Sequence, residues 1–493
     1  MKKNLLSVAV AASVAGAATI AQADGLGPMF VSPENTGETL IFPYYNAENG
    51  NTTSFHIVNT TADAKALKVR FREYKASYEV LDFNVYMSPK DHFSFTVAKN
   101  PAGDGGALIT RDNTCTLPAL GGANPPFNGG TTADGAVYQP FVNFAYSKQA
   151  DSSIERSLAG YVEVIEMGAS DTSTEGKAWK AAVTHAKGVP SKCATLSTLW
   201  ATGAWATTPQ AGMTGKGGGL YGISYALNAN DAAAFGIEPV VIDNFRSGPI
   251  HATPGSLNPN LGSGNTSSIR VFDDGTNAPT SLTASYTNST NAVSSLMMTT
   301  KIMNDVMNNA AVGAQTDWVI TFPTKYYYTN NLAGGGLNNA PPSAPFSEAF
   351  VTGSATTKEN LACETVTITS YDREEATIVT ENPGFSPAPP SAAASQICYE
   401  MNVLQNSAES SLNATLPVSA FVFPFTDGWM DLGFAGANSV NTGLDSSTTG
   451  ADLKGLPAVG FMATKYENST VVGGTLYSYG HVAEHKYNVT TSS

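Results

Sequence analysis

The stretch Leu67-Lys68-Val69-Arg70-Phe71-Arg72-Glu73-Tyr74 decides the fold class, because apolar and charged residues alternate along it with a period of two. Such alternation is typical of a β-strand. Short segments of strand character surround it at Thr39–Phe42, Ser54–Val58, Val80–Tyr86 and His92–Val97, separated by polar turns. Four or five short strands at this spacing predict one antiparallel sheet of a β-sandwich.

Strand character returns further along the chain, at Gly160–Met167, at Leu220–Leu227 and in many short segments after Asp317. Between these regions, residues 247–291 are rich in Gly, Ser, Thr and Asn, and Ala292–Asn309 carries apolar residues at helical spacing. The methionines of that helix are expected in a core, because such a stripe is far more often core than a binding groove.

These patterns predict a mainly β protein with two immunoglobulin-like antiparallel β-sandwich units, long loops and a few short helices. The expected N-terminal unit, with loop insertions, covers residues 24–246. A polar linker and helix follow over residues 247–316, and the C-terminal unit covers residues 317–493.

The first 23 residues, MKKNLLSVAVAASVAGAATIAQA, predict a secretory signal peptide. Lys2 and Lys3 form the charged region, an apolar run follows, and Ala21-Gln22-Ala23 is a cleavage signature. The apolar run is short and ends at this signature, so we do not interpret it as a membrane anchor. We expect export to the cell surface or the extracellular medium, with the periplasm as the alternative, and no integral membrane insertion.

The charge balance excludes some classes of partner. Removing Lys2 and Lys3 from the 26 basic residues leaves 24 against 40 acidic ones, a formal charge of −16. Nucleic-acid binding requires a basic surface, so no nucleic-acid partner is expected. Only 13% of the residues are charged, well below the usual quarter of a globular protein. The surface must therefore be built from Ser, Thr, Asn and Gly, as in extracellular array and adhesin-type proteins.

Four cysteines, Cys115, Cys193, Cys363 and Cys398, occur in the chain, and none is in a CxxC spacing. In an exported chain an even number predicts disulfides rather than a metal site. Three pairings are open. We prefer Cys115–Cys193 with Cys363–Cys398, because each bond then closes a loop within one half of the chain.

Two motifs could be interpreted as functional sites, but each has a simpler structural interpretation. His481 and His485 stand four residues apart, which on a helix could hold zinc, but the pattern is not HExxH and follows a strand; two exposed histidines are expected. The glycine-rich stretch Gly212–Gly219 lacks the spacing of a phosphate-binding loop and is interpreted as a flexible turn before the next strand.

Two acidic stretches also offer oxygen ligands or carboxylate pairs. Asp273-Asp274-Gly275-Thr276-Asn277 offers oxygen ligands for a structural calcium ion, but it lacks the order of an EF-hand, and an Asx turn is preferred. Asp372-Arg373-Glu374-Glu375 is interpreted as a solvated strand end rather than a catalytic carboxylate pair. No G-x-S-x-G motif occurs. We therefore predict no catalytic residue, no metal ligand and no cofactor, and we name no binding residue.

Several segments resemble a pattern found in uncharacterised exported proteins of Gram-negative bacteria. They are Ile57–Thr61, Ala64–Glu73, Val80–Asp91, Thr316–Lys325 and Tyr479–Tyr487. The resemblance spans much of the chain and implies export and a β-rich architecture. That family has no established activity, so it assigns no site residue.

Together these observations predict a non-enzymatic exported structural or cell-surface protein that self-associates, or binds other surface proteins or glycans, in a layer or filament. The alternative is a secreted or periplasmic module for a glycan or protein. That module would use loops such as Pro101–Gln139, and five tyrosines, Tyr44, Tyr45, Tyr326, Tyr327 and Tyr328, could stack on sugars. An exported hydrolase ranks third.

Overall fold

The computed structural model describes most of the chain after residue 26. The described residues are 27–124, 127–147, 149, 151–273, 280–329, 331–332, 336–337, 343–346, 362–380, 396–421, 423–434, 443–444, 452–472, 475–489 and 491–492. The expected signal peptide therefore lies outside the described residues. Within them the prediction of a mainly β protein built from antiparallel sheets is confirmed.

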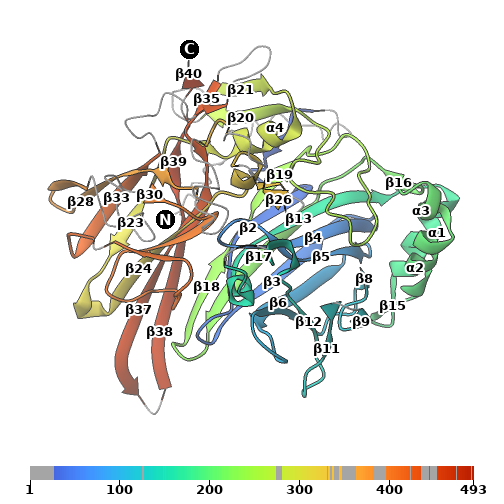
Figure 1. Ribbon diagram of the computed structural model, residues 1–493, viewed down its shortest axis with the longest axis horizontal. Helices are drawn as coiled ribbons and strands as arrows, with labels where there is room; N and C mark the ends of the chain where they lie inside the picture. The colour runs from blue at the N-terminus through green and yellow to red at the C-terminus, as the bar shows by residue number, and fades with distance from the viewer. Residues whose placement is uncertain are drawn as a thin grey trace, which may run out of the picture.

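The N-terminal unit contains two large sheets (Figure 1). The strands of the eight-stranded sheet are, in spatial order, β1 (Phe30–Val31), β19 (Val240–Asp243), β2 (Thr39–Asn46), β13 (Ala159–Ser170), β4 (Lys65–Glu73), β5 (Glu79–Met87) and β8 (Cys115–Leu117), with β16 (Met213–Thr214) on β13. Those of the seven-stranded sheet are β11 (Gly130–Thr131), β12 (Val137–Pro140), β7 (Gly106–Thr110), β6 (His92–Lys99), β3 (Asn51–Asn59), β17 (Leu220–Asn228) and β18 (Ala233–Ile237). Together they hold more strands than an immunoglobulin domain.

One hydrophobic core joins these two sheets. Alternate residues of β4, Leu67, Val69 and Phe71, share it with Phe55 of β3 and Phe95 of β6, and all five are buried. Phe55 and Phe95 stack with their ring centroids 5.0 Å apart. The period-two pattern thus places every second residue of each strand between the sheets.

The C-terminal unit is built from two smaller sheets. The first contains β29 (Thr377–Thr380), β28 (Thr367–Asp372), β33 (Asp427–Gly433), β23 (Lys301–Met307) and β39 (Lys486–Asn488). The second contains β32 (Val418–Ala420), β31 (Met401–Gln405), β24 (Ala314–Thr321), β37 (Val459–Val472) and β38 (Thr475–Glu484). Trp318 and Ile320 of β24 share a core with Ile302 of β23, Ile368 of β28 and Leu432 of β33.

The segment predicted as a helix over Ala292–Asn309 is only partly helical, which corrects that prediction. Helix α4 spans Ser289–Leu296, and β22 (Met298–Thr299) and β23 follow. Ile302 and Val306 are buried, a spacing that a strand accommodates as well as a helix does. The segment Lys301–Met307 forms a strand because β33, more than a hundred residues later in the chain, pairs with it along its whole length. The methionines Met297 and Met298 are core residues.

The two units share an apolar interface. Tyr44, Tyr161 and Ile237 of the N-terminal unit lie in one buried cluster with Val319 and Phe461 of the C-terminal unit. At one side of this interface β38 lies beside β18, and Figure 1 shows the red strands next to the green one. The backbones approach closely there, because a side chain at Gly480 would collide with the carbonyl oxygen of Ala234.

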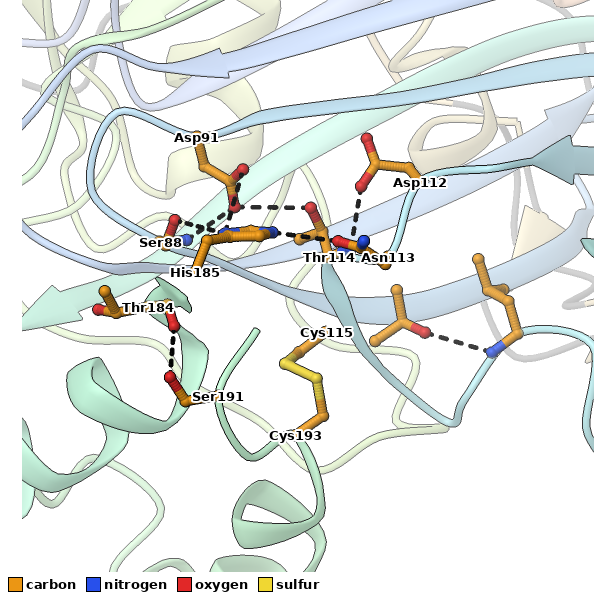
Figure 2. Close-up of a disulfide and its surroundings, with 12 residues drawn as sticks. Ser88, Asp91, Asp112, Asn113, Thr114, Cys115, Thr184, His185, Ser191 and Cys193 are labelled. Carbon is orange, nitrogen blue, oxygen red and sulfur yellow. Dashed lines mark hydrogen bonds and ion pairs between the residues drawn. A yellow bond between two sulfur atoms is a disulfide. The ribbon is translucent and has the colours of Figure 1, made fainter. Parts of the chain in front are cut away.

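Two disulfides, Cys115–Cys193 and Cys363–Cys398, are present. They follow the sequential arrangement preferred from the sequence. The first joins the end of the eight-stranded sheet to a small helical excursion that contains α1 (Thr174–Val183), α2 (Ala194–Ala201) and α3 (Ala204–Thr207). Figure 2 shows that His185, beside this disulfide, contacts Ser88 and Asn113, with ring nitrogen to oxygen distances of 3.0 and 3.2 Å. The excursion is therefore anchored to the strands at two points.

Candidate functional site

The outward face of the seven-stranded sheet is an uncharged surface with exposed tyrosines. Residues that alternate with the core positions of its central strands point away from the other sheet. We call these residues the outer platform; they are Thr52, Ser54, His56 and Val58 of β3, His92, Ser94, Thr96 and Ala98 of β6, and Tyr221, Ile223, Tyr225 and Leu227 of β17. None of these twelve positions holds Asp, Glu, Lys or Arg.

Antiparallel pairing brings the platform residues together in rows. Tyr225 pairs with Ser54, which pairs with Thr96, and Leu227 pairs with Thr52. Tyr221, Tyr225 and Leu227 are 41%, 38% and 37% exposed. Large apolar side chains are normally buried, so three of them on one face of a strand form an exposed apolar stripe.

The platform has the size of the functional surface patches found on folded proteins. Three strands at their usual spacing, over the six-residue span from Tyr221 to Leu227, cover roughly 300 Å² in projection. Ile109, Tyr138 and Ala234 of the neighbouring strands lie in the same rows and extend it. Patches of this size on a folded protein are often functional.

Two histidines face one another on the platform. Nδ1 of His56 lies 3.0 Å from Nε2 of His92. The ring of His56 also meets the ring of Tyr225 edge-on, with centroids 5.7 Å apart, and its Nε2 is 3.5 Å from the hydroxyl of Ser54. Partial burial, followed by the proximity of His92, lowers the pKa of His56. When both rings are neutral, one donates a hydrogen bond to the other, because the N–H of one imidazole meets the unprotonated nitrogen of its neighbour.

The charged residues of the stretch that decides the fold lie elsewhere, in the interior. Lys68, Arg70 and Arg72 point to the opposite face of β4 from the apolar residues and are buried. Nζ of Lys68 lies 2.6 Å from Asp82, and Arg70 pairs with Glu79 and with Glu163. Burial, followed by the proximity of Glu79, raises the pKa of Asp82 to about 6. These charges form internal pairs rather than an accessible site.

A later segment of the chain covers this charged face. The carbonyl oxygens of Ala252, Ser256 and Pro259 accept hydrogen bonds from Asn84, Lys68 and Arg70. Residues 247–291, expected as a polar linker, thus include a stretch that supplies hydrogen-bond acceptors to buried donors. This cover keeps the charged face of the eight-stranded sheet away from solvent.

The five tyrosines proposed to stack on sugars do not form a stacking surface, so that hypothesis was wrong. Tyr44, Tyr45 and Tyr328 are buried in three different clusters, Tyr326 is buried against Arg72, and Tyr327 is partly buried. Tyr327 donates a hydrogen bond of 2.8 Å to Asn260. These tyrosines pack in the interior because burial of each ring removes a large apolar area from water.

The glycine-rich stretch Gly212–Gly219 covers a buried ion cluster. The amide of Gly218 donates to the carboxylate of Glu166 at 3.1 Å, and Glu166 also pairs with Arg246 at 2.5 Å and Lys65 at 2.9 Å. A side chain at Gly217 would collide with the carboxylate of Glu38. The carboxylate that this loop binds is therefore part of the chain itself. A pocket of about 630 Å³ lies beside it, and the Lys65 ammonium on its wall is already paired.

The other candidate residues are separate. His481 is exposed on β38, and His485 is buried, with Nε2 3.0 Å from the carbonyl oxygen of Val319. The expectation of two exposed histidines was therefore wrong for His485. Asp372 ends β28, and its carboxylate accepts the amides of Glu374 and Ala376 in a turn. Most of the stretch Asp273–Asn277 lies outside the described residues.

Within the part of the chain that the structure describes, no three His, Cys, Asp or Glu side chains are arranged to hold a metal ion. No helix in that part combines the length and apolar character needed to cross a membrane. Comparisons with protein-family models, with curated proteins and with solved structures gave no match.

Sequence reasoning missed the outer platform. Its signal was present in the uncharged alternation of Ser54–Val58 and of Tyr221–Leu227, whose outward positions carry Ser, His, Tyr and Leu instead of charges. In β4, by contrast, the face opposite the apolar core carries Lys68, Arg70 and Arg72, and that face is covered by another part of the chain.

Proposed function

We propose that this protein is a non-enzymatic exported structural protein that self-associates through the outer platform. The observation that carries the proposal is the uncharged, aromatic, exposed face of the seven-stranded sheet. The two disulfides support an oxidising destination outside the cytoplasm. The signal-like N-terminal sequence supports the same location.

The charge of the chain favours a second copy as the occupant of the platform. The full sequence has a formal net charge of −14, so two copies repel one another over most orientations. None of the twelve platform residues is acidic, although the carboxylate of Asp112 lies at its edge against Ser94, so contact there limits the repulsion between like charges. A flat face that meets its own copy gives an isologous, two-fold interface.

Layers or filaments need a second contact, because a single isologous interface closes at the dimer. The chain has several exposed side chains away from the platform, including Phe144 and Tyr487. We therefore propose the dimer through the platform as the first step, and the larger assembly as its extension.

Substitution of the platform tyrosines tests the proposal. We expect the Tyr221→Lys/Tyr225→Lys variant to sediment as a monomer at concentrations where the unmodified mature protein forms dimers or larger species. The matched control is Tyr479→Lys, because Tyr479 is exposed at 64% on β38 outside the platform. Electron microscopy of both samples shows whether ordered assemblies disappear with the dimer. An unmodified protein that stays monomeric at all concentrations and ionic strengths would overturn the proposal.

A glycan is the second candidate occupant of the same face. Tyr221 and Tyr225 offer exposed rings, and Ser54, Thr96 and Ser94 offer hydroxyl groups beside them. Sugars are recognised by such combinations of aromatic faces and precisely placed polar groups. Binding of polysaccharides by the unmodified protein, lost in the double tyrosine variant and without any change in sedimentation, favours this alternative over self-association.

A further inference from the structure

We infer that His56 and His92 form a binding site for a divalent transition-metal ion, with Cu²⁺ as the preferred ion. Both residues lie on the outer platform, but the inference does not depend on self-association. It rests on the distance between two imidazole nitrogens and on the pairing of the strands that carry them.

The distance between the two nitrogens fits a chelate. Nδ1 of His56 and Nε2 of His92 are 3.0 Å apart. A metal ion about 2.1 Å from each nitrogen would see them at an angle of about 90°. This angle belongs to square-planar or octahedral coordination rather than to a tetrahedron, and tetragonal nitrogen and oxygen sites favour Cu²⁺ or Ni²⁺ over Zn²⁺.

The rings are oriented through their nitrogen edges. Their centroids are 5.2 Å apart and their planes differ by 19°, so at a nitrogen separation of 3.0 Å the nitrogens, not the ring faces, lie nearest. Without a metal, one proton occupies the space between the nitrogens. A metal ion that binds both releases this proton, since neutral imidazole is the ligand form.

The supporting strands hold the pair in place. β3 and β6 are neighbours inside the seven-stranded sheet, where Val58 pairs with His92 and His56 pairs with Ser94. The ring of Tyr225 restricts His56 on its other side. Each ring needs only to turn so that its nitrogen lone pair points at a shared ion, because the strands already hold the two nitrogens at the required separation.

The site is open on its outer side. Both histidines are at least partly exposed, and within the described residues no third His, Cys, Asp or Glu completes a ligand set. Water molecules would therefore occupy the remaining positions. The surplus negative charge of the chain favours the approach of a cation. The Irving–Williams order places Cu²⁺ above Ni²⁺ and Zn²⁺ for such ligands.

The test is a titration of the mature protein with Cu²⁺, followed by calorimetry and by electron paramagnetic resonance. Because two preorganised ligands act as a chelate, His56→Gln and His92→Gln should each weaken binding on the order of 100-fold. Each should also remove nitrogen hyperfine structure from the spectrum. His481→Gln is the control, since His481 is an exposed histidine on another strand. The titrations are made at a concentration where the protein is monomeric, and circular dichroism checks the fold of each variant.

The expected result is one Cu²⁺ per chain in the unmodified protein and in the His481→Gln control, with binding lost in the other two. Equal affinity and identical spectra for the unmodified protein and the His56→Gln/His92→Gln double variant would overturn the inference. Stronger binding of Zn²⁺ than of Cu²⁺ would overturn the preference for a square-planar ion.

Discussion

The guanidinium of Arg72 lies over the ring of Tyr326, 4.7 Å from its centroid, and donates a hydrogen bond of 3.1 Å to the phenol oxygen. Arg72 belongs to β4, and Tyr326 belongs to a short helical turn (Lys325–Tyr327) that follows β24. Both side chains are buried. A contact between residues 254 positions apart thus fixes the charged face of the eight-stranded sheet to the C-terminal unit.

Substitution of Arg72 tests the energetic role of this contact. In Arg72→Met the carboxylate of Glu163 loses a partner at 3.5 Å, and Glu79 loses one at 3.7 Å. Both carboxylates keep Arg70 as a partner, so the loss should stay below the roughly 3–5 kcal/mol of a fully unpaired buried charge, and we expect a decrease of about 1–3 kcal/mol in the free energy of unfolding measured in urea. The Arg72→Met/Glu163→Gln variant should recover part of the loss. No recovery would mean that the cation–ring contact, not the ion pair, carries the effect.

The buried carboxyl of Glu400 should make stability depend on pH at neutral values. Burial raises its pKa to about 8, against the opposing effect of Lys325, and Ser77 donates a hydrogen bond of 2.9 Å to it. In the unfolded chain the carboxyl ionises near pH 4.5, so the native state holds the proton longer. The free energy of unfolding is therefore highest, as far as this group is concerned, at acidic pH. It falls as the pH rises from about 4.5 to 8, by up to about 1.4 kcal/mol per pH unit.

The variant Glu400→Gln should remove this dependence and should be more stable than the unmodified protein at pH 8. Glu374→Gln, at an exposed position, is the matched control and should leave the pH profile unchanged. Midpoints of urea unfolding between pH 5 and pH 8 provide the measurement. Parallel profiles for Glu400→Gln and the unmodified protein would contradict the raised pKa.

His485 should have the opposite effect on the acidic side. Burial lowers its pKa to about 4, although its bond to the carbonyl of Val319 opposes this shift, and its ring packs 4.8 Å from that of Trp318. The unfolded chain binds this proton near pH 6.5 and the native chain only near pH 4. Stability is therefore lost as the pH falls from 6.5 to 4. His485→Gln should flatten that limb of the profile, and His481→Gln should not. Equal slopes in all three proteins would refute the assignment.

Removal of the disulfides should destabilise the protein to different extents. The loops span 78 and 35 residues, and the chain-entropy model gives about 4.5 kcal/mol for the longer and about 3.8 kcal/mol for the shorter. We expect Cys115→Ala/Cys193→Ala to lower the melting temperature more than Cys363→Ala/Cys398→Ala, as calorimetry will show. The reverse order would mean that packing at the second disulfide outweighs loop length.

The sequence predicted those strands well whose own residues alternate between apolar and polar with a period of two. Leu67, Val69 and Phe71 alternate with charged residues, and this pattern alone places them in the core. The same pattern could not show that Lys68 and Arg70 are also buried. Their cover comes from Ser256 and Pro259, almost two hundred positions later, and a local pattern contains no information about it.

The candidate site was not predictable for a related reason. His56 and His92 are 36 positions apart, and only the register of β3 against β6 brings their nitrogens together. A shift of one residue would turn one ring toward the core. In contrast, the spacing of His481 and His485 is visible in the sequence but has no significance on a strand, where residues four apart are well separated along the chain.

The contact between β18 and β38 affects how the protein can fold during synthesis. The N-terminal unit emerges long before residues 475–484, so the outer edge of β18, which pairs only with β17, lacks the cover of β38 while the rest of the chain is made. An uncovered strand edge is a template for pairing with other chains. The protein therefore passes through a vulnerable stage that ends only when its last strands arrive. A chain shortened at its C-terminus would remain at that stage, with one strand edge permanently open.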